Sequence, residues 1–284
     1  FIAKIDTTKR GAESLLWCSY LGGSGNEVFF NGALAADGAG HVVVAIETSS
    51  SDFPTTPNAF QSRDTSLGSL DVVVAKLDTT VAGPASLVYA TYLGGNNNEF
   101  ITGNSIAVDD KGIIHVAGST YSTDFPTTPD AFRTVKNGDL EAFVVKLDPS
   151  GNGPSDLLYG TYLGGNQLDW LFALALDGRG RAWVTGVTTS PDFSVRGGFQ
   201  PAHHGNDDVF VACIDTTEKG DAALAWSSLL GGSENEWGYG IALEGDGRLY
   251  LAGWTSSPDF PVTGGFQTAF HGDWDGFVAC LETT

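Results

Sequence analysis

Acidic side chains recur at matching positions along this chain, and carboxylates could bind a cation or act on a sugar. Calcium needs six to eight oxygens around one ion, and glycoside hydrolysis needs two carboxyl groups across the scissile bond. Repetition at equal spacing favours a structural role instead, in which each acid caps the backbone of a turn or loop. The four sets are Glu27, Asp37, Asp52 and Asp71; Glu99, Asp109, Asp124 and Glu141; Asp169, Asp177, Asp192 and Asp208; and Glu236, Glu244, Asp259 and Asp275.

Specific metal or catalytic motifs are missing from the sequence. There is no Asp-x-Asp-x-Asp-Gly calcium loop, and residues 96–99 resemble one only faintly. With 34 acids in the chain, some carboxyl pair will be close by chance, so the sequence singles out none. His204 and His271 stand in matching His-Gly-x-x-Asp segments, which we interpret as surface histidines beside structural acids. We therefore predict no catalytic residue, no metal ligand and no cofactor, with calcium as the alternative.

Two tryptophans depart from the repeated pattern. Trp254 and Trp274 stand where the second copy has Ser119 and Leu140. An aromatic residue in a variable position often marks a surface that recognises protein or sugar. We therefore predict Trp254 and Trp274 as binding residues. Trp170 and Trp237, each directly after a repeated acid, are predicted to be packing residues.

The acids belong to a repeat that covers the whole chain. Tyr-Leu-Gly-Gly at residues 92–95 is followed by Glu99, and copies start at residues 20, 162 and 229. Self-similarity at a fixed period indicates stacked copies of one supersecondary unit. We predict that the two glycines form a hinge between strands, because glycine adopts backbone geometry that other residues resist.

Each repeat predicts four short strands. An alternating segment such as residues 143–148 is typical of a strand, and two further strands flank a tight turn of the form acid-x-x-Gly, such as residues 109–112. Asp-Phe-Pro-Thr-Thr-Pro segments predict an ordered surface loop. Four-stranded antiparallel units of about 70 residues around an axis describe an all-β propeller, with a β-solenoid as the competing architecture.

The predicted domain is a single propeller body over residues 1–284. Its repeats span approximately residues 7–78, 79–148, 149–215 and 216–282, and residues 1–6 form one extra strand. The strand total is therefore 17, which does not divide into whole blades. The chain would be part of a longer propeller, lend a strand to another copy, or combine its blades with a second copy.

The repeat resembles the bacterial SBBP-type β-propeller repeat. The resemblance is carried by Tyr-Leu-Gly-Gly-x-x-x-Glu, Ile-Ala-Val-Asp-x-x-Gly, Val-Ala-Gly-x-Thr-x-Ser-x-Asp-Phe-Pro-Thr-Thr and Phe-Val-x-Lys-Leu-Asp, most completely at residues 92–148. It implies propeller blades in a secreted or surface protein, and it implies no reaction. The family name suggests seven blades, whereas this chain has four repeats.

Charge and composition exclude several function classes. The formal net charge is −20, which repels nucleic-acid phosphates and anionic membranes. No apolar run is long enough to span a membrane. The chain begins at Phe1 and holds no methionine, so we expect a processed product or a piece of a longer protein. Cys18, Cys213 and Cys280 are predicted to be free, half-buried thiols on strands.

These observations predict a non-enzymatic scaffold for protein interaction, adhesion or assembly, in an extracellular or cell-surface location. Its partners would be proteins or copies of itself, and glycans are the alternative. A carbohydrate-binding or carbohydrate-cleaving propeller is the second hypothesis. The third is a self-assembling fibre or shell subunit that exchanges strands at its termini.

Overall fold

The computed structural model describes residues 1–66, 68–245 and 247–282, with the side chains of residues 29–31 excepted. Within these residues the chain is all-β, with 18 strands and four short 3₁₀ helices. The helices span Gly11–Ser14, Gly83–Ser86, Gly153–Asp156 and Gly220–Ala223. The strands are β1 (Ile2–Ile5), β2 (Leu15–Ser19), β3 (Glu27–Ala36), β4 (His41–Thr48), β5 (Asp71–Asp78), β6 (Leu87–Leu93), β7 (Glu99–Phe100), β8 (Ile106–Val108), β9 (Ile114–Thr120), β10 (Glu141–Leu147), β11 (Leu157–Leu163), β12 (Asp169–Leu176), β13 (Ala182–Thr188), β14 (Asp208–Ile214), β15 (Leu224–Leu230), β16 (Glu236–Glu244), β17 (Arg248–Thr255) and β18 (Asp275–Glu282).

The strands form five antiparallel sheets. An N-terminal hairpin pairs β1 with β2; the first sheet has the order β3-β4-β5-β6, and the second β7-β9-β10-β11 with β8 also on β9. The third sheet is β12-β13-β14-β15 and the fourth is β16-β17-β18. Each of the first three sheets takes its last strand from the following sequence repeat; β6, for example, lies beyond residue 78. The sheets are therefore offset by one strand from the repeats.

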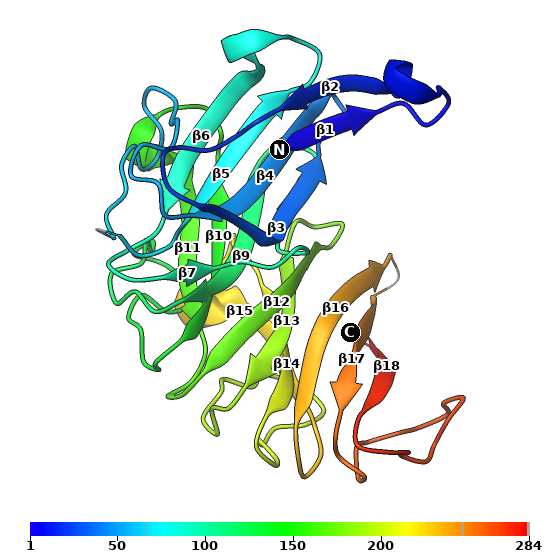
Figure 1. The fold of residues 1–284 in the computed structure, drawn as a ribbon. Coiled ribbons are helices and arrows are strands. Elements are labelled where there is room, and N and C mark those ends of the chain that lie inside the picture. The colour runs from blue at the N-terminus through cyan, green and yellow to red at the C-terminus, as the bar shows by residue number, and fades with distance from the viewer. Residues whose placement is uncertain (67, 246, 283–284) are drawn as a thin grey trace.

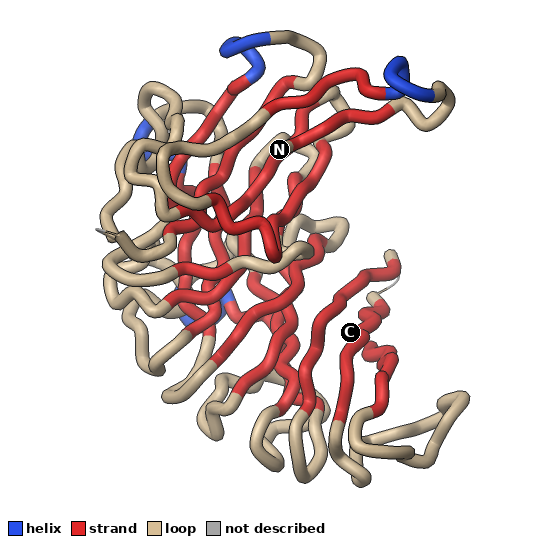
Figure 2. The backbone as a smooth tube through the Cα atoms, in the orientation of Figure 1, coloured by secondary structure: helices blue, strands red, loops and turns tan. Residues whose placement is uncertain are grey.

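The sheets follow one another along an open arc. In Figure 1 the N-terminal hairpin and the fourth sheet lie at its two ends, and β3, β12 and β16 face its hollow. Loops and turns gather at the strand ends, mainly along the outer margin of the arc, as Figure 2 shows. Stacking of twisted antiparallel sheets face to face around a centre is the arrangement of propeller blades.

Four apolar clusters fill the spaces between neighbouring sheets. Val74 and Val145 belong to the cluster between the first and second sheets, and Val144 and Phe210 to the one between the second and third. The central strands are covered on both faces, which explains why β5 reads as a nearly unbroken apolar run. Trp183 is fully buried in the cluster between the third and fourth sheets.

The predicted turns are confirmed. Asp109 is followed by Gly112, whose N–H donates to the Asp109 carbonyl at 3.0 Å, and its φ of 80° suits glycine. The Asp109 carboxylate accepts the N–H groups of Lys111 and Ile113. Asp37 and Asp177 accept backbone N–H groups of their turns in the same way, so these acids have the structural role that the repetition predicted. Among the described contacts, the bonds of the Glu244 carboxylate come from side chains.

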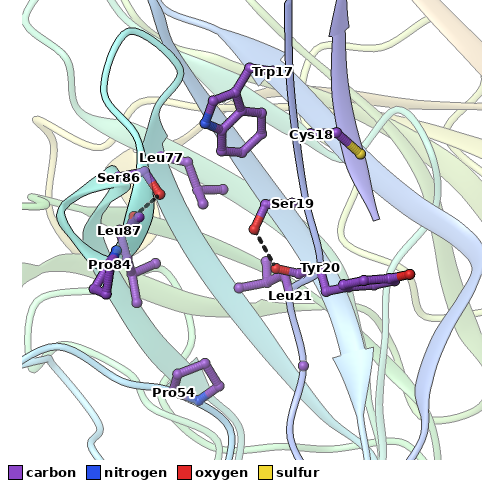
Figure 3. Close-up of a pocket in the computed structure, with 12 residues that line it drawn as sticks. Trp17, Cys18, Ser19, Tyr20, Leu21, Pro54, Leu77, Pro84, Ser86 and Leu87 are labelled. Atoms are coloured by element: carbon purple, nitrogen blue, oxygen red, sulfur yellow. Dashed lines mark hydrogen bonds between the residues drawn. The ribbon is translucent and has the colours of Figure 1, made fainter. Parts of the chain in front are cut away.

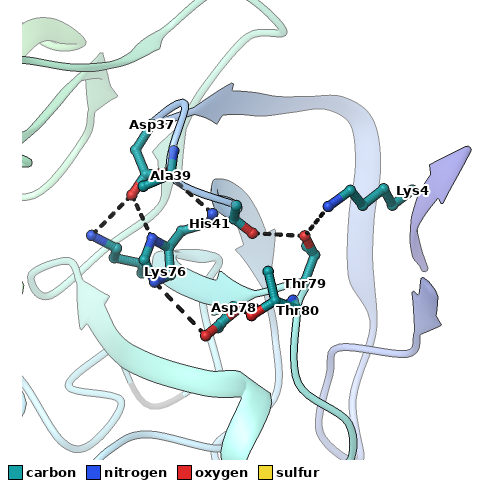
Figure 4. A network of polar contacts seen from close by, with 9 residues as sticks. Lys4, Asp37, Ala39, His41, Lys76, Asp78, Thr79 and Thr80 are labelled. Carbon is teal, nitrogen blue, oxygen red and sulfur yellow. Dashed lines mark hydrogen bonds and ion pairs between the residues drawn. The ribbon is translucent and has the colours of Figure 1, made fainter. Parts of the chain in front are cut away.

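A polar network ties the N-terminal hairpin to the first sheet. Asp37 accepts from His41 at 2.7 Å and lies 3.3 Å from Lys76. Thr79 donates to the carbonyl of Gly40 and accepts from Lys4 of β1, as Figure 4 shows. Partial burial opposes ionisation of Asp37, but the hydrogen bonds from Ala39 and His41 outweigh it and lower the Asp37 pKa to about 2.

Candidate functional site

A continuous row of aromatic rings crosses the second, third and fourth sheets. We call it the aromatic row and define it by its members: Phe100, Tyr121, Trp170, Phe172, Trp237, Tyr239, Trp254 and Trp274. Neighbouring ring centroids lie 4.4–6.1 Å apart. The closest pair is Trp254 and Trp274, stacked at 4.4 Å with an interplanar angle of 10°. Rings at such separations attract each other beyond the area they bury.

The row crosses from one sheet to the next at two places. Phe100 of β7 meets Trp170 of β12 at 5.8 Å, and Phe172 of β12 meets Trp237 of β16 at 5.6 Å. Trp237 is oriented by its indole N–H, which donates to Asp207 at 2.8 Å. The row therefore depends on how neighbouring sheets are positioned.

Two β-bulges add rings to the row. The pairing of β12 with β13 shifts between Leu171 and Ala173, which leaves Phe172 as the extra residue. The pairing of β16 with β17 shifts in the same way between Gly238 and Gly240, which leaves Tyr239. A bulge redirects a side chain, and here both redirected side chains stack on each other, with centroids 4.7 Å apart.

The row exposes several of its rings. Trp170 is 36% exposed, Tyr239 47% and Trp274 66%, whereas Phe172 is buried. Large exposed aromatic side chains cost solvation free energy unless a ligand covers them. The aromatic row is therefore the candidate functional site of this chain.

The predicted binding residues Trp254 and Trp274 lie together at one end of the row. The structure also places Trp170 and Trp237 in it, although their repeat position predicts packing residues. Trp237 is half-buried and fits that prediction in part, but the exposure of Trp170 does not. The missed signal was an aromatic residue one and three positions after the acid in both the third and fourth repeats.

The glycine pair of the Leu-Gly-Gly motif lies between two strands, β6 and β7, as predicted, but the predicted backbone reason for it is wrong. Neither Gly94 nor Gly95 has a positive φ. A Cβ on Gly94 would lie 2.4 Å from Asp71 Oδ1 and 2.6 Å from Glu99 Oε2. The motif needs glycine because two carboxyl groups occupy the space of the missing side chain.

Similar carboxyl pairs recur at three sheet-to-sheet junctions. Each pair joins the first residue of a central strand to the first residue of the next sheet, and each flanks the first glycine of the motif. We call them the junction pairs. They are Asp71 with Glu99, Glu141 with Asp169, and Asp208 with Glu236.

Burial raises the pKa of several junction carboxyls. Burial, with the charge of Glu99 nearby, raises the pKa of Asp71 to about 8. Burial raises the pKa of Glu99 to about 7, although hydrogen bonds from Ser122 and Thr120 oppose the shift. Burial likewise raises the pKa of both Asp169 and Asp208 to about 6.

The other predicted acids cap loops. Asp124 accepts the N–H of Asn96 at 2.7 Å, and Asp192 that of Asn166 at 2.8 Å. His204 and His271 are exposed, as predicted, and their backbone N–H groups donate to Asp208 and Asp275. No set of three or more His, Cys, Asp or Glu side chains among the described residues is arranged to hold a metal ion.

The cysteines are free, as predicted, but none is half-buried. Cys213 is buried, whereas Cys18 and Cys280 are exposed. Burial raises the pKa of Cys213 to about 12, so this thiol is unreactive at neutral pH. No helix within the described part of the chain has both the length and the apolar character needed to cross a membrane.

A surface groove lies between β2 and the first sheet. Trp17, Tyr20, Leu21, Pro54 and Leu87 line it, as Figure 3 shows. The described residues of its lining include no carboxylate and no histidine.

Comparison with known families bears on the same segments. Residues 88–126 and residues 225–261 match the family model described as a beta-propeller repeat, SBBP. Both segments are thus similar to SBBP beta-propeller repeats. No curated protein matches the chain. The two SBBP segments contain Glu99 and Glu236 of the junction pairs. They also contain five members of the aromatic row, which are Phe100, Tyr121, Trp237, Tyr239 and Trp254.

Proposed function

We propose that this chain is a non-enzymatic binding module of a secreted or cell-surface protein, and that its partner rests on the aromatic row. The observation that carries the proposal is the exposure of Trp170, Tyr239 and Trp274 within one contiguous set of rings. Tryptophan and tyrosine dominate the binding energy of protein interfaces. The surface location rests on the resemblance to SBBP repeats.

The buried junction pairs argue against hydrolysis at the groups with shifted pKa values. A general acid must come within hydrogen-bonding reach of its substrate. Glu99, Asp169 and Asp208 have no solvent-exposed surface, so a substrate cannot reach them. We therefore assign adhesion or assembly to the chain, with a protein partner whose contact surface is apolar or basic, since the net charge of the chain is −20.

A carbohydrate ligand is the second candidate, and the Trp254–Trp274 stack favours it. The outer indole, Trp274, is 66% exposed, so a flat ring face is open to a sugar.

The two candidates can be separated with one set of variants. The labelled chain is bound to cell envelopes before and after protease treatment, and to a panel of polysaccharides. Trp170→Ala and Trp274→Ala remove members of the aromatic row. Phe266→Ala is the matched control, because Phe266 is fully exposed and belongs to no ring contact among the described residues.

We expect binding to cell envelopes to be lost after protease treatment. The affinity of the row variants should fall at least about tenfold, a loss typical of interface hot spots, and that of Phe266→Ala should be unchanged. Retention on a polysaccharide with the same dependence would support the second candidate. Equal binding by all variants would refute the role of the row, and turnover of a polysaccharide would refute a non-enzymatic module.

Self-assembly by strand exchange stays a prediction. Within the described residues β18 pairs only with β17, and β1 only with β2, so both leave ladder groups that another strand can pair with. Size measurement in solution before and after deletion of residues 1–6 tests it. A monomer in both forms would remove this hypothesis.

A further inference from the structure

The junction pair Asp71–Glu99 contains a carboxyl group that no hydrogen-bond donor reaches. Asp71 is 1% exposed, no donor among the described residues bonds to either of its carboxyl oxygens, and its polar neighbours are the carboxyl groups of Glu99 and Asp64. A buried unpaired carboxylate is strongly destabilising. The group needs either a proton or a cation.

The bonds of Glu99 indicate which member carries the proton. Glu99 Oε1 accepts from Thr120 at 2.7 Å and from Ser122 at 2.6 Å, and Oε2 accepts the N–H of Gly95 at 3.2 Å. Three donors stabilise the ionised form of Glu99. Asp71 has none, so it is the member that stays protonated, and Glu99 is the acceptor beside it.

The groups around Asp71 reinforce this assignment. Glu99 faces it from β7 and Asp64 from the loop before β5, and both negative charges disfavour its ionisation. Tyr92 of β6 lies on the same side and contributes no positive charge. None of the ion pairs among the described residues involves Asp71. A proton is therefore the positive charge that can neutralise this carboxyl group.

The equivalent acid of the third junction is held differently. Asp208 Oδ2 accepts from the Gln200 amide at 3.0 Å and from the His204 N–H at 2.9 Å. His203 and His204 also contribute positive charge when protonated. Asp208 therefore depends less on a proton than Asp71 does.

We propose that Asp71 and Glu99 share one proton that holds the first sheet against the second. Loss of this proton to solvent at alkaline pH then loosens the junction next to Phe100, the member of the aromatic row that lies beside it. The link to the row is direct. Glu99 N–H donates to the carbonyl of Leu70 across the junction at 2.7 Å, and the next residue, Phe100, is the row member that stacks on Trp170. Two ionised carboxylates at this junction repel each other and separate β5 from β7.

The effect on a ligand rests on the function proposed above, but the effect on the junction does not. Hydrogen exchange of the segment around residues 95–106 reports the junction without any ligand. Exchange is measured by mass spectrometry between pH 6 and about 9.5 and corrected for the intrinsic pH dependence of exchange. The wild-type chain is compared with Asp71→Asn, whose neutral amide can donate to Glu99 as the protonated acid does, and with the matched control Asp208→Asn.

In the wild-type chain we expect protection of this segment to fall by up to about tenfold per pH unit once Asp71 ionises. Asp71→Asn should keep its protection across the range, and Asp208→Asn should follow the wild-type profile. Protection that stays flat in the wild-type chain would overturn the proposal, as would the same profile in Asp71→Asn. Millimolar CaCl₂ that restores wild-type protection at alkaline pH would also overturn it, because a cation would then replace the proton.

Should Asp71→Asn fail to fold, the pH profile of the wild-type chain with and without CaCl₂ still shows whether a proton holds the junction. Should the junction loosen while binding to cell envelopes or polysaccharides stays constant with pH, the shared proton is confirmed and its coupling to the aromatic row is refuted. Failure of the present inference is thus distinguishable from failure of the proposed function.

Discussion

Replacement of Gly94 by alanine tests the explanation of the Leu-Gly-Gly motif. The new Cβ would lie 2.4 Å from Asp71 Oδ1 and 2.6 Å from Glu99 Oε2, well inside van der Waals contact. Overpacking of this kind costs about 1–3 kcal/mol. Displacement of Glu99 would also weaken its bonds from Gly95, Thr120 and Ser122, and a hydrogen bond to a charged group contributes about 1.5–3 kcal/mol.

We therefore expect Gly94→Ala to lower the free energy of unfolding by about 3 kcal/mol or more. The thermal midpoint should fall by roughly 6–12 °C in a chain of this size. Gly178→Ala is the matched control, because its Cβ would meet no atom within 4 Å and its φ is not positive; its unfolding should change by less than about 0.5 kcal/mol.

Urea and thermal unfolding followed by circular dichroism measure both variants. A double-mutant cycle with Asp71→Ala separates the contact from the general effect of a methyl group. Removal of the Asp71 carboxyl should recover part of the loss. Equal midpoints for Gly94→Ala and Gly178→Ala, or no coupling to Asp71, would refute the assignment.

Three further predictions concern pH, a buried hydroxyl and metal. The pKa of Asp169 is raised to about 6, so its contribution to stability is present below pH 4 and is lost as the pH rises through 6. Between pH 4 and 7 the free energy of unfolding of the wild-type chain should therefore fall by up to about 3 kcal/mol relative to that of Asp169→Asn. Urea unfolding curves that change in parallel for the two proteins would contradict this. Tyr162 accepts from Phe125 N–H and donates to the Ser122 carbonyl, so Tyr162→Phe should cost about 1–3 kcal/mol in thermal unfolding, whereas Tyr239→Phe should be nearly neutral. Dialysis against EDTA should leave the unfolding midpoint unchanged, and a shift of several degrees that calcium reverses would reveal a cation site.

Local patterns were enough to predict the strands and turns. Alternation of apolar residues and the acid-x-x-Gly turns depend on neighbours in sequence, and the structure has strands at β1, β5, β9 and β10 where these patterns placed them. Repetition also indicated correctly that the acids of the turns and loops cap the backbone, as Asp109 and Asp124 do.

The tertiary structure alone decided what the glycines and tryptophans do. Gly94 is required by Asp71 and Glu99, which come from different strands of two sheets and meet only when the sheets pack. Trp170 resembled a packing residue because its repeat position is apolar elsewhere, and its exposure depends on the turn from one sheet to the next.

The sequence by itself therefore determined the elements and their repetition, since these follow from hydrogen bonding and polarity along the chain. Only the packing of sheet against sheet decided which side chains from distant repeats share a space. The junction pairs and the aromatic row both arise there, because burial and ring stacking are properties of the assembled sheets.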